Sequence, residues 1–189
     1  MWQPMKSTPG TFKLEIIPEP AMPANVDQAI KNLLCDCFPP DIPIFSKTRY
    51  WHGTAPDYSL VCRSTGQVIG HVGIVVRAIT AGGRTATVAG IQNLAVSREW
   101  RKTGLSGQLM TEAMEEARRR GIPFGLLFCV PGLAKFYASL GWETIPASAV
   151  MIAAEGKEEP IPAKNITMVL RLGSQAFPPG LISLQGMDW

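Results

Sequence analysis

The sequence predicts one α/β domain built on a mixed sheet. Three features lead to this prediction. Residues 85–130 read as a strand, a helix and a strand, antiparallel strands precede this unit around the hairpin signal Ala81-Gly82-Gly83, and a second strand pair follows it. Regular alternation of strands and helices is missing, so the sheet is not doubly wound. We expect residues 1–189 to form a single domain, with a core at 12–172 and a proline- and glycine-rich tail at 173–189.

The first elements follow from hydrophobic spacing. Residues 12–17 alternate weakly and predict a strand, whereas residues 25–35 predict a helix whose buried face holds Val26, Ile30, Leu33 and Leu34. Residues 36–45 form a proline-broken loop with a short helical turn. A short strand at 58–62 turns through Ser64-Thr65-Gly66 into a long strand at 67–79, and the return strand is 85–96.

The later elements follow from hydrophobic spacing and from the glycine and proline residues that end helices. Residues 104–120 predict a helix with an apolar stripe, ended by Gly121 and Pro123; the stripe is Leu105, Leu109, Ala113 and Ala117. Residues 124–130 are apolar throughout, as in a central strand buried on both faces. A short helix at 133–140 ends at Gly141, and strands near 150–154 and 166–172 are expected to form a hairpin.

Composition excludes several classes of function. The chain has 18 basic and 15 acidic residues, and its net charge of +3 does not predict a nucleic-acid surface. The longest apolar run, residues 124–130, is too short to span a membrane, and residues 1–10 lack the apolar segment of a signal peptide. The four cysteines form no CxxC pair, and there are only two histidines, so we expect no metal site and a reduced, cytoplasmic protein.

The turn from Arg101 to Ser106 is the most informative segment, because it joins an apolar strand directly to an amphipathic helix. A glycine-bearing turn at a helix start presents free backbone N–H groups, and the helix dipole adds positive potential there. Such a turn suits a phosphate group. Its spacing matches neither the P-loop nor the three-glycine dinucleotide fingerprint.

Two motifs resemble the GNAT superfamily of N-acetyltransferases. The family's Arg/Gln-x-x-Gly-x-Gly/Ala turn matches Arg101, Gly104 and Ser106, with serine at the last position, and the Leu-x-Val end of its preceding strand matches Leu94 and Val96. About thirty residues later the family's Phe-Tyr-x-x-Leu-Gly-Phe/Trp pattern matches Phe136-Tyr137 through Gly141-Trp142. The resemblance covers roughly residues 12–172. It implies about six to seven strands with helices on both faces, splayed between the strands ending near Val96 and Val130.

Weaker cues resemble the branch that holds aminoglycoside 2′-N-acetyltransferases and rhizobial nodulation acyltransferases. They are the segment Val68-Ile69-Gly70-His71-Val72, the residues around Tyr137, and the chain end at Gly186-x-x-Trp189.

The resemblance implies acetyl-CoA as co-substrate and assigns residues to it. The pyrophosphate would lie on the turn, and the pantetheine arm would pair with the preceding strand; the residues concerned are Leu94, Ala95, Val96, Arg101, Lys102, Thr103, Gly104, Leu105 and Ser106. The N–H near Leu94 would face the thioester carbonyl, an oxyanion-type contact. Tyr137 is implied as the general acid for the departing thiolate.

The general base is left open by the sequence. The aminoglycoside branch implies a glutamate near Gln92, but glutamine cannot accept a proton. Asp188, the carboxylate of Trp189 and His71 are alternatives, with His71 more typical of a hydrogen-bonded core histidine. A relay through water and a neutral incoming amine also stay open. Cys129, at the end of a central strand, is expected to be a core residue rather than an acyl carrier.

These patterns predict an enzyme that moves an acetyl group from acetyl-CoA to a primary amine of a small molecule by direct attack in a ternary complex. Residues 36–52 are expected to form one wall of the acceptor site, because loops on a fixed scaffold often determine specificity. Two alternatives remain, namely a non-catalytic acyl-CoA-binding regulator and an acyltransferase that uses a longer acyl chain or an acyl carrier protein. Neither the acceptor nor the oligomeric state follows from the sequence, and a homodimer is left open.

Overall fold

A computed structural model of the chain describes residues 11–153 and 156–189. The helices are α1 (Ala24–Cys37), α2 (Ile42–Phe45), α3 (Leu105–Arg119) and α4 (Ala134–Ala138), and short 3-10 helices lie at Glu19–Ala21, Pro39–Asp41, Arg98–Trp100 and Pro131–Leu133. The strands are β1 (Lys13–Pro18), β2 (Tyr58–Ser64), β3 (Gln67–Ala81), β4 (Arg84–Val96), β5 (Phe124–Cys129), β6 (Glu143–Ile145), β7 (Ala149–Ile152), β8 (Glu158–Pro160), β9 (Ile166–Arg171) and β10 (Ile182–Ser183).

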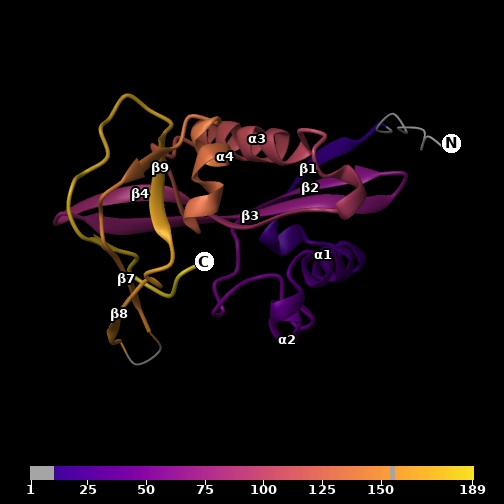
Figure 1. The fold of residues 1–189 in the computed structure, drawn as a ribbon, viewed down its shortest axis with the longest axis horizontal. Coiled ribbons are helices and arrows are strands. Elements are labelled where there is room, and N and C mark those ends of the chain that lie inside the picture. Colours follow the sequence, from indigo (N-terminus) through magenta and orange to yellow (C-terminus); the bar gives the residue numbers. More distant parts are fainter. Residues whose placement is uncertain (1–10, 154–155) are drawn as a thin grey trace, which may run out of the picture.

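These strands form one mixed sheet around the long β3–β4 hairpin. The strand order is β6-β9-β5-β4-β3-β10-β7-β8, while β1 and β2 extend the sheet beside the first half of β3. In Figure 1, α3 and α4 lie on one face of the sheet and α1 and α2 on the other. The predicted fold class, a mixed sheet with helices on both faces, is confirmed.

The two long helices bury the faces that their spacing predicts. In α1 the buried residues are Val26, Ile30, Leu33 and Leu34; in α3 the expected stripe is buried together with Met110 and Met114. Gly104 is the N-cap of α3 in the left-handed conformation, and Gly121 follows its C-terminal end. β5 is buried along almost its whole length, as expected for a central strand.

The strand pairing after β5 differs from the predicted hairpin. The predicted strands near 150–154 and 166–172 do not pair with each other: β9 pairs with β5 and β6, whereas β7 pairs with β8 and β10. The expected end of the first strand, Ala154, lies outside the described residues. β6, β8 and β10 are two or three residues long, too short for alternation to be visible, and the other seven strands are those expected.

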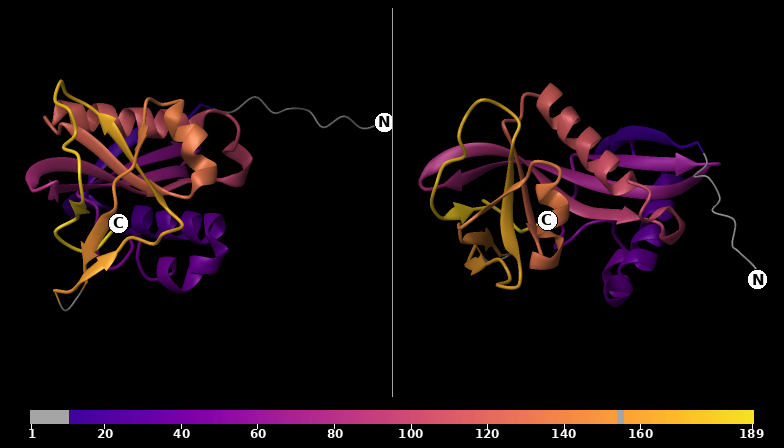
Figure 2. Two further views of the ribbon diagram at one scale, coloured as in Figure 1. Left: turned by 60° about the vertical axis from the view of Figure 1, so that its left-hand side comes forward. Right: turned by 45° about the horizontal axis from the view of Figure 1, so that its top comes forward.

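The chain end belongs to the folded core. The segment after Gly173, expected to be a tail outside the core, supplies β10, which pairs with β3 and β7. Ile182, Leu184 and Trp189 are buried. Trp189 packs on Gly90 of β4, since a Cβ atom added at Gly90 would lie 2.2 Å from the indole ring. Both views in Figure 2 show the C-terminus lying against the sheet.

Candidate active site

The central strands β4 and β5 separate toward their C-terminal ends, as the family resemblance implies. β4 and β5 are parallel, but they pair only at Val88–Phe124, Ala89–Gly125 and Gly90–Leu126. Beyond Gly90 the two strands diverge, so the backbone of β4 from Ile91 to Val96 has no strand partner on this edge within the described part of the chain. An open edge of this kind can pair with an extended ligand.

A β-bulge interrupts β4 within this open stretch. Gly73 of β3 faces Gln92 and His71 faces Ala95, so two residues, Asn93 and Leu94, lie opposite Val72 alone. Asn93 adopts a positive φ of 53°, a conformation that asparagine tolerates better than most residues. Its side-chain Nδ2 donates to the Arg49 carbonyl at 2.8 Å. The bulge is therefore held from the loop that follows α2.

A cavity of about 540 Å³ runs from this bulge to the start of α3. Seven of the predicted residues line it: Leu94, Ala95, Val96, Arg101, Lys102, Ser106 and Tyr137. The remaining lining residues are Cys37, Phe38, Trp100, Leu133 and Phe136. The cavity thus joins both predicted motifs and includes Phe38 from the predicted acceptor wall.

The start of α3 has the geometry of an anion site. Lys102 and Gly104 have positive φ values of 64° and 88°, and the Gln108 N–H closes the first helical turn on the Gly104 carbonyl at 3.1 Å. The N–H groups that precede it in a helix have no acceptor within that helix. Arg101 and Lys102 add two positive charges to the cavity wall. These features together favour a negatively charged group.

Three of the predicted turn residues contribute no side chain to the cavity lining. The Thr103 hydroxyl donates to the Trp100 carbonyl at 2.7 Å, and Gly104 has no side chain. The Leu105 side chain is buried in the core against β3 rather than lining the cavity. Only the backbone N–H groups of these three residues could serve a ligand.

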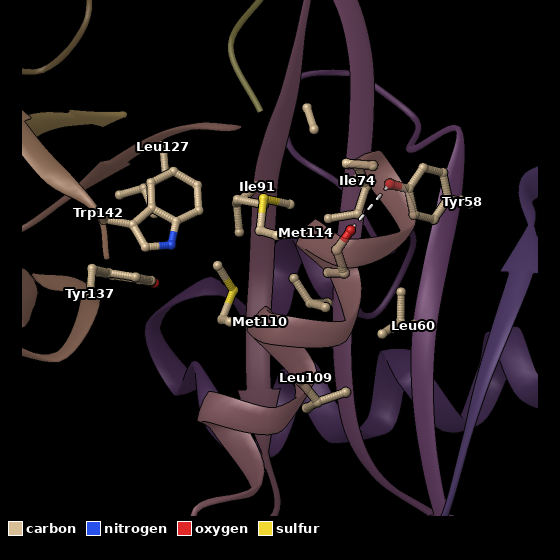
Figure 3. Packing of buried hydrophobic residues seen from close by; sticks show 14 of the residues in the cluster. Tyr58, Leu60, Ile74, Ile91, Leu109, Met110, Met114, Leu127, Tyr137 and Trp142 are labelled. Atoms are coloured by element: carbon tan, nitrogen blue, oxygen red, sulfur yellow. Dashed lines mark hydrogen bonds between the residues drawn. The ribbon is translucent and has the colours of Figure 1, made fainter. Parts of the chain in front are cut away.

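Tyr137 projects from α4 into the cavity and is largely buried. Its ring contacts Phe136 and Trp142 edge to face, with centroids 5.0 and 6.1 Å away. Gly141 follows the end of α4 at a positive φ of 87°, and the next residue, Trp142, packs on Gly125. Figure 3 shows Tyr137 and Trp142 within the cluster that also holds Met110 and Leu127. Burial, with a smaller effect of Cys129, raises the pKa of Tyr137 to about 12, so its phenol stays protonated at neutral pH.

Gln92, at the position where the resemblance implies a glutamate, is buried, and both the nitrogen and the oxygen of its amide are hydrogen-bonded. Its Nε2 donates to the Thr54 carbonyl at 3.0 Å, and its Oε1 accepts from Asn93 Nδ2 at 3.3 Å. Cys129 is also a core residue: burial raises its thiol pKa, and its Sγ lies 3.9 Å from Met168 Sδ. All four cysteines fall within the described residues and carry free thiols.

Spacing in the sequence did not predict the contact between His52 and Asp188. The His52 Nδ1 atom pairs with the Asp188 carboxylate, and the two residues are 136 positions apart. Asp188 is fixed by its neighbours, because Arg77 donates to the Met187 carbonyl at 2.6 Å and stacks over the Trp189 ring. The pair thus connects the loop anchored on Gln92 and Asn93 to the chain end anchored on Gly90. No local signal in the sequence could have shown it.

The geometry agrees with a match to a known family. Residues 21–145 match the model of the acetyltransferase (GNAT) domain, which is about two thirds of the chain. The chain belongs to the GNAT acetyltransferase family. A comparison with curated proteins found no match.

Solved GNAT structures share the fold. The GNAT-family N-acetyltransferase YhbS of Escherichia coli, in complex with CoA, is 22% identical with a TM-score of 0.67, and the alignment covers 94% of this chain and 93% of that one. A GNAT acetyltransferase of Brucella melitensis, in complex with acetyl-CoA, is 19% identical with a TM-score of 0.61, over 92% and 96% of the two chains. An aminoglycoside 6′-N-acetyltransferase with coenzyme A is 13% identical with a TM-score of 0.57, over 86% and 99%.

Two further observations on the described residues concern membrane-spanning helices and metal-binding groups. No helix in residues 11–153 and 156–189 is long and apolar enough to cross a membrane. Across the same ranges, no three His, Cys, Asp or Glu side chains lie together in a group that could hold a metal ion.

Proposed function

We propose that this GNAT domain transfers an acetyl group from acetyl-CoA to a primary amine of a small molecule by direct attack in a ternary complex. The observation that carries the proposal is the single cavity that connects the start of α3, the open edge of β4 and Tyr137. A donor with an anionic end, an extended polar arm and a thioester matches these three parts in order.

The donor would be held mainly by backbone groups. Arg101, Lys102 and the N–H groups of residues 103–106 would bind the pyrophosphate of CoA. The pantetheine arm would pair with Leu94, Ala95 and Val96, whose open edge is joined by no strand of residues 11–153 and 156–189. The N–H of Leu94, inside the bulge, would donate to the thioester carbonyl and stabilise its developing negative charge.

Transfer then needs two proton movements. The amine nitrogen attacks the thioester carbon, the C–S bond of the resulting tetrahedral intermediate breaks, and the sulfur leaves with the bonding electrons. Tyr137 would protonate this thiolate, since its raised pKa keeps the phenol protonated before the reaction. The amine releases one proton as the amide forms.

We assign acceptance of that proton to His52, oriented by Asp188. An imidazole whose Nδ1 is held by a carboxylate leaves Nε2 free to accept. The pair lies between the loop anchored to Gln92 and Asn93 and the chain end packed on Gly90. Residues 36–52 would supply the acceptor wall, with Phe38 reaching the cavity.

One observation favours a second function, a non-catalytic acyl-CoA-binding regulator. Gln92 is a bonded amide at the place where the resemblance implies a carboxylate base. The similarity to the aminoglycoside 2′-N-acetyltransferase branch rests on sequence cues alone, and we propose no aminoglycoside acceptor.

The two functions are separated by measuring free thiol release from acetyl-CoA with a panel of primary amines, corrected for hydrolysis. The enzyme predicts turnover with at least one amine. Calorimetric binding of acetyl-CoA with no turnover on any amine would favour the regulator. Absence of binding would contradict both functions.

A further inference from the structure

The carbonyl of Asn93 belongs to the β-bulge and is hydrogen-bonded to a buried histidine. His71 Nδ1 lies 3.2 Å from the Asn93 oxygen, on the face of the sheet that α1 covers. A carbonyl cannot donate, so Nδ1 carries the hydrogen and Nε2 is the acceptor. Ser59 Oγ lies 3.2 Å from Nε2 and therefore donates to it.

This contact fixes the direction of the neighbouring N–H. The Asn93 carbonyl and the Leu94 N–H belong to one peptide group, and the described peptide bonds are all trans. In a trans peptide the C=O and N–H point in opposite directions. Because the carbonyl points to His71, the Leu94 N–H points away from His71, and Leu94 lines the same cavity as Tyr137.

The hydrogen bonds that connect Arg49 to the Asn93 carbonyl through Ser59 and His71 all donate in the same direction. Arg49 Nη1 donates to Ser59 Oγ at 3.5 Å, Ser59 donates to His71, and His71 donates to the Asn93 carbonyl. Arg49 is itself buried and paired with Glu19 and Asp27. Each donor in such a chain polarises the next, so the positive end at Arg49 strengthens the Leu94 N–H as a donor.

The charge state of His71 suits this role. Its side chain is 0% exposed. Burial and the nearby charge of Arg49 lower the pKa of His71 to about 3, partly offset by the contact with Asn93. The imidazole is therefore neutral at working pH and keeps one donor and one acceptor.

We propose that His71 is a positioning residue that aims and polarises the Leu94 N–H toward the acyl carbonyl through the chain Arg49, Ser59, His71 and the Asn93 peptide. The inference rests on the proposed function, because it assigns the carbonyl contact to Leu94. It makes a core histidine part of acyl activation without contact to the substrate.

Two substitutions separate the two ring nitrogens. An asparagine amide in His71→Asn reaches about as far as Nδ1 and can keep the donor to Asn93. The longer amide of His71→Gln reaches about as far as Nε2 and keeps the contact with Ser59 instead. Both variants leave the cavity lining unchanged, so calorimetry with CoA, which lacks the acyl group, reports whether the cradle and the fold persist.

The test is the infrared stretching band of the carbonyl in bound [1-13C]acetyl-CoA, compared with the band in solution. We expect a shift to lower frequency in the wild type and in His71→Asn, loss of most of that shift in His71→Gln, and CoA affinities within twofold. Ser59→Ala should reduce the shift partially, and it serves if His71→Gln does not fold.

The infrared bands test the Leu94 contact and the role of His71 separately. A wild-type band at the solution frequency would remove the Leu94 contact itself. A shifted wild-type band that is unchanged in His71→Gln, or in Ser59→Ala if that variant replaces it, would overturn only the role of His71.

Discussion

Gly104→Val is expected to abolish acetyl-CoA binding while the domain stays folded. Gly104 has a φ of 88°, and no heavy atom lies within 4 Å of a Cβ added there. The cost of the substitution therefore comes from the backbone and not from a clash. A left-handed conformation costs an L-residue about 1–2 kcal/mol, and a β-branched residue is the least tolerant. The turn is expected to relieve this strain by leaving its conformation.

The magnitude follows from what the turn would hold. Hydrogen bonds to a charged group contribute about 1.5–3 kcal/mol each. Loss of two of them from the pyrophosphate corresponds to about 3–6 kcal/mol, or at least about a hundredfold in affinity. The free protein would lose only the backbone strain of about 1–2 kcal/mol, which lowers Tm by about 2–8 °C for a domain of this size.

Gly121→Val is the matched control for this substitution. Gly121 follows the other end of α3, has a φ of 75°, and also has no heavy atom within 4 Å of an added Cβ. Both variants should therefore lose similar stability in thermal unfolding, and calorimetry with acetyl-CoA should separate them. If the two variants bind acetyl-CoA with affinities within about threefold of each other, the cradle assignment is refuted.

Three further predictions concern the catalytic groups and the buried histidine. Tyr137→Phe should lower kcat by about a hundredfold or more with an unchanged Kd for acetyl-CoA, since general acids contribute about that much; an unaltered kcat would remove Tyr137 as the acid. His52→Ala and Asp188→Asn should each lower kcat with the amine by about tenfold or more. The double variant should have a kcat close to that of either single variant, because the two residues act as a unit. If the losses in kcat multiply in steady-state kinetics, the two residues have independent roles. Stability should fall as pH drops below about 6.5, where the unfolded chain protonates His71 but the folded chain, with a pKa of about 3, does not; the slope from this residue reaches about 1.4 kcal/mol per pH unit. Urea unfolding between pH 7 and pH 5 should show a flatter dependence in His71→Gln, and identical slopes would contradict the lowered pKa.

Hydrophobic spacing predicted the elements that bury a continuous face. The stripes of α1 and α3 are buried as expected, because a helix exposes one side to the core at every turn. β10 could not be predicted in this way, since its two residues become a strand only by filling the gap between β3 and β7. The same reason applies to the pairing of β9 with β5, since it joins two segments that are separated along the chain by other strands of the sheet.

The candidate site was predictable where it is local in sequence. The Arg101–Ser106 turn and the Tyr137 motif each carry their own signal, and the cavity brings them together. The bulge at Asn93 carries no such signal, because it depends on the register between β3 and β4. For His71 the expectation of a hydrogen-bonded core histidine agrees with its burial, but its partners Ser59 and Asn93 come from two other segments of the chain.

Gln92 bears both on the absence of a carboxylate base at position 92 and on the placement of His52, the base that we propose. A carboxylate at this position could accept from Asn93 but could not donate to the Thr54 carbonyl, which an amide does at 3.0 Å. Gln92 is also only 3% exposed, where an unpaired charge would be costly. The amide therefore ties residues 49–54 to β4 beside the bulge. Because this loop carries His52, the residue that cannot serve as the base helps to hold the histidine that we assign to that role.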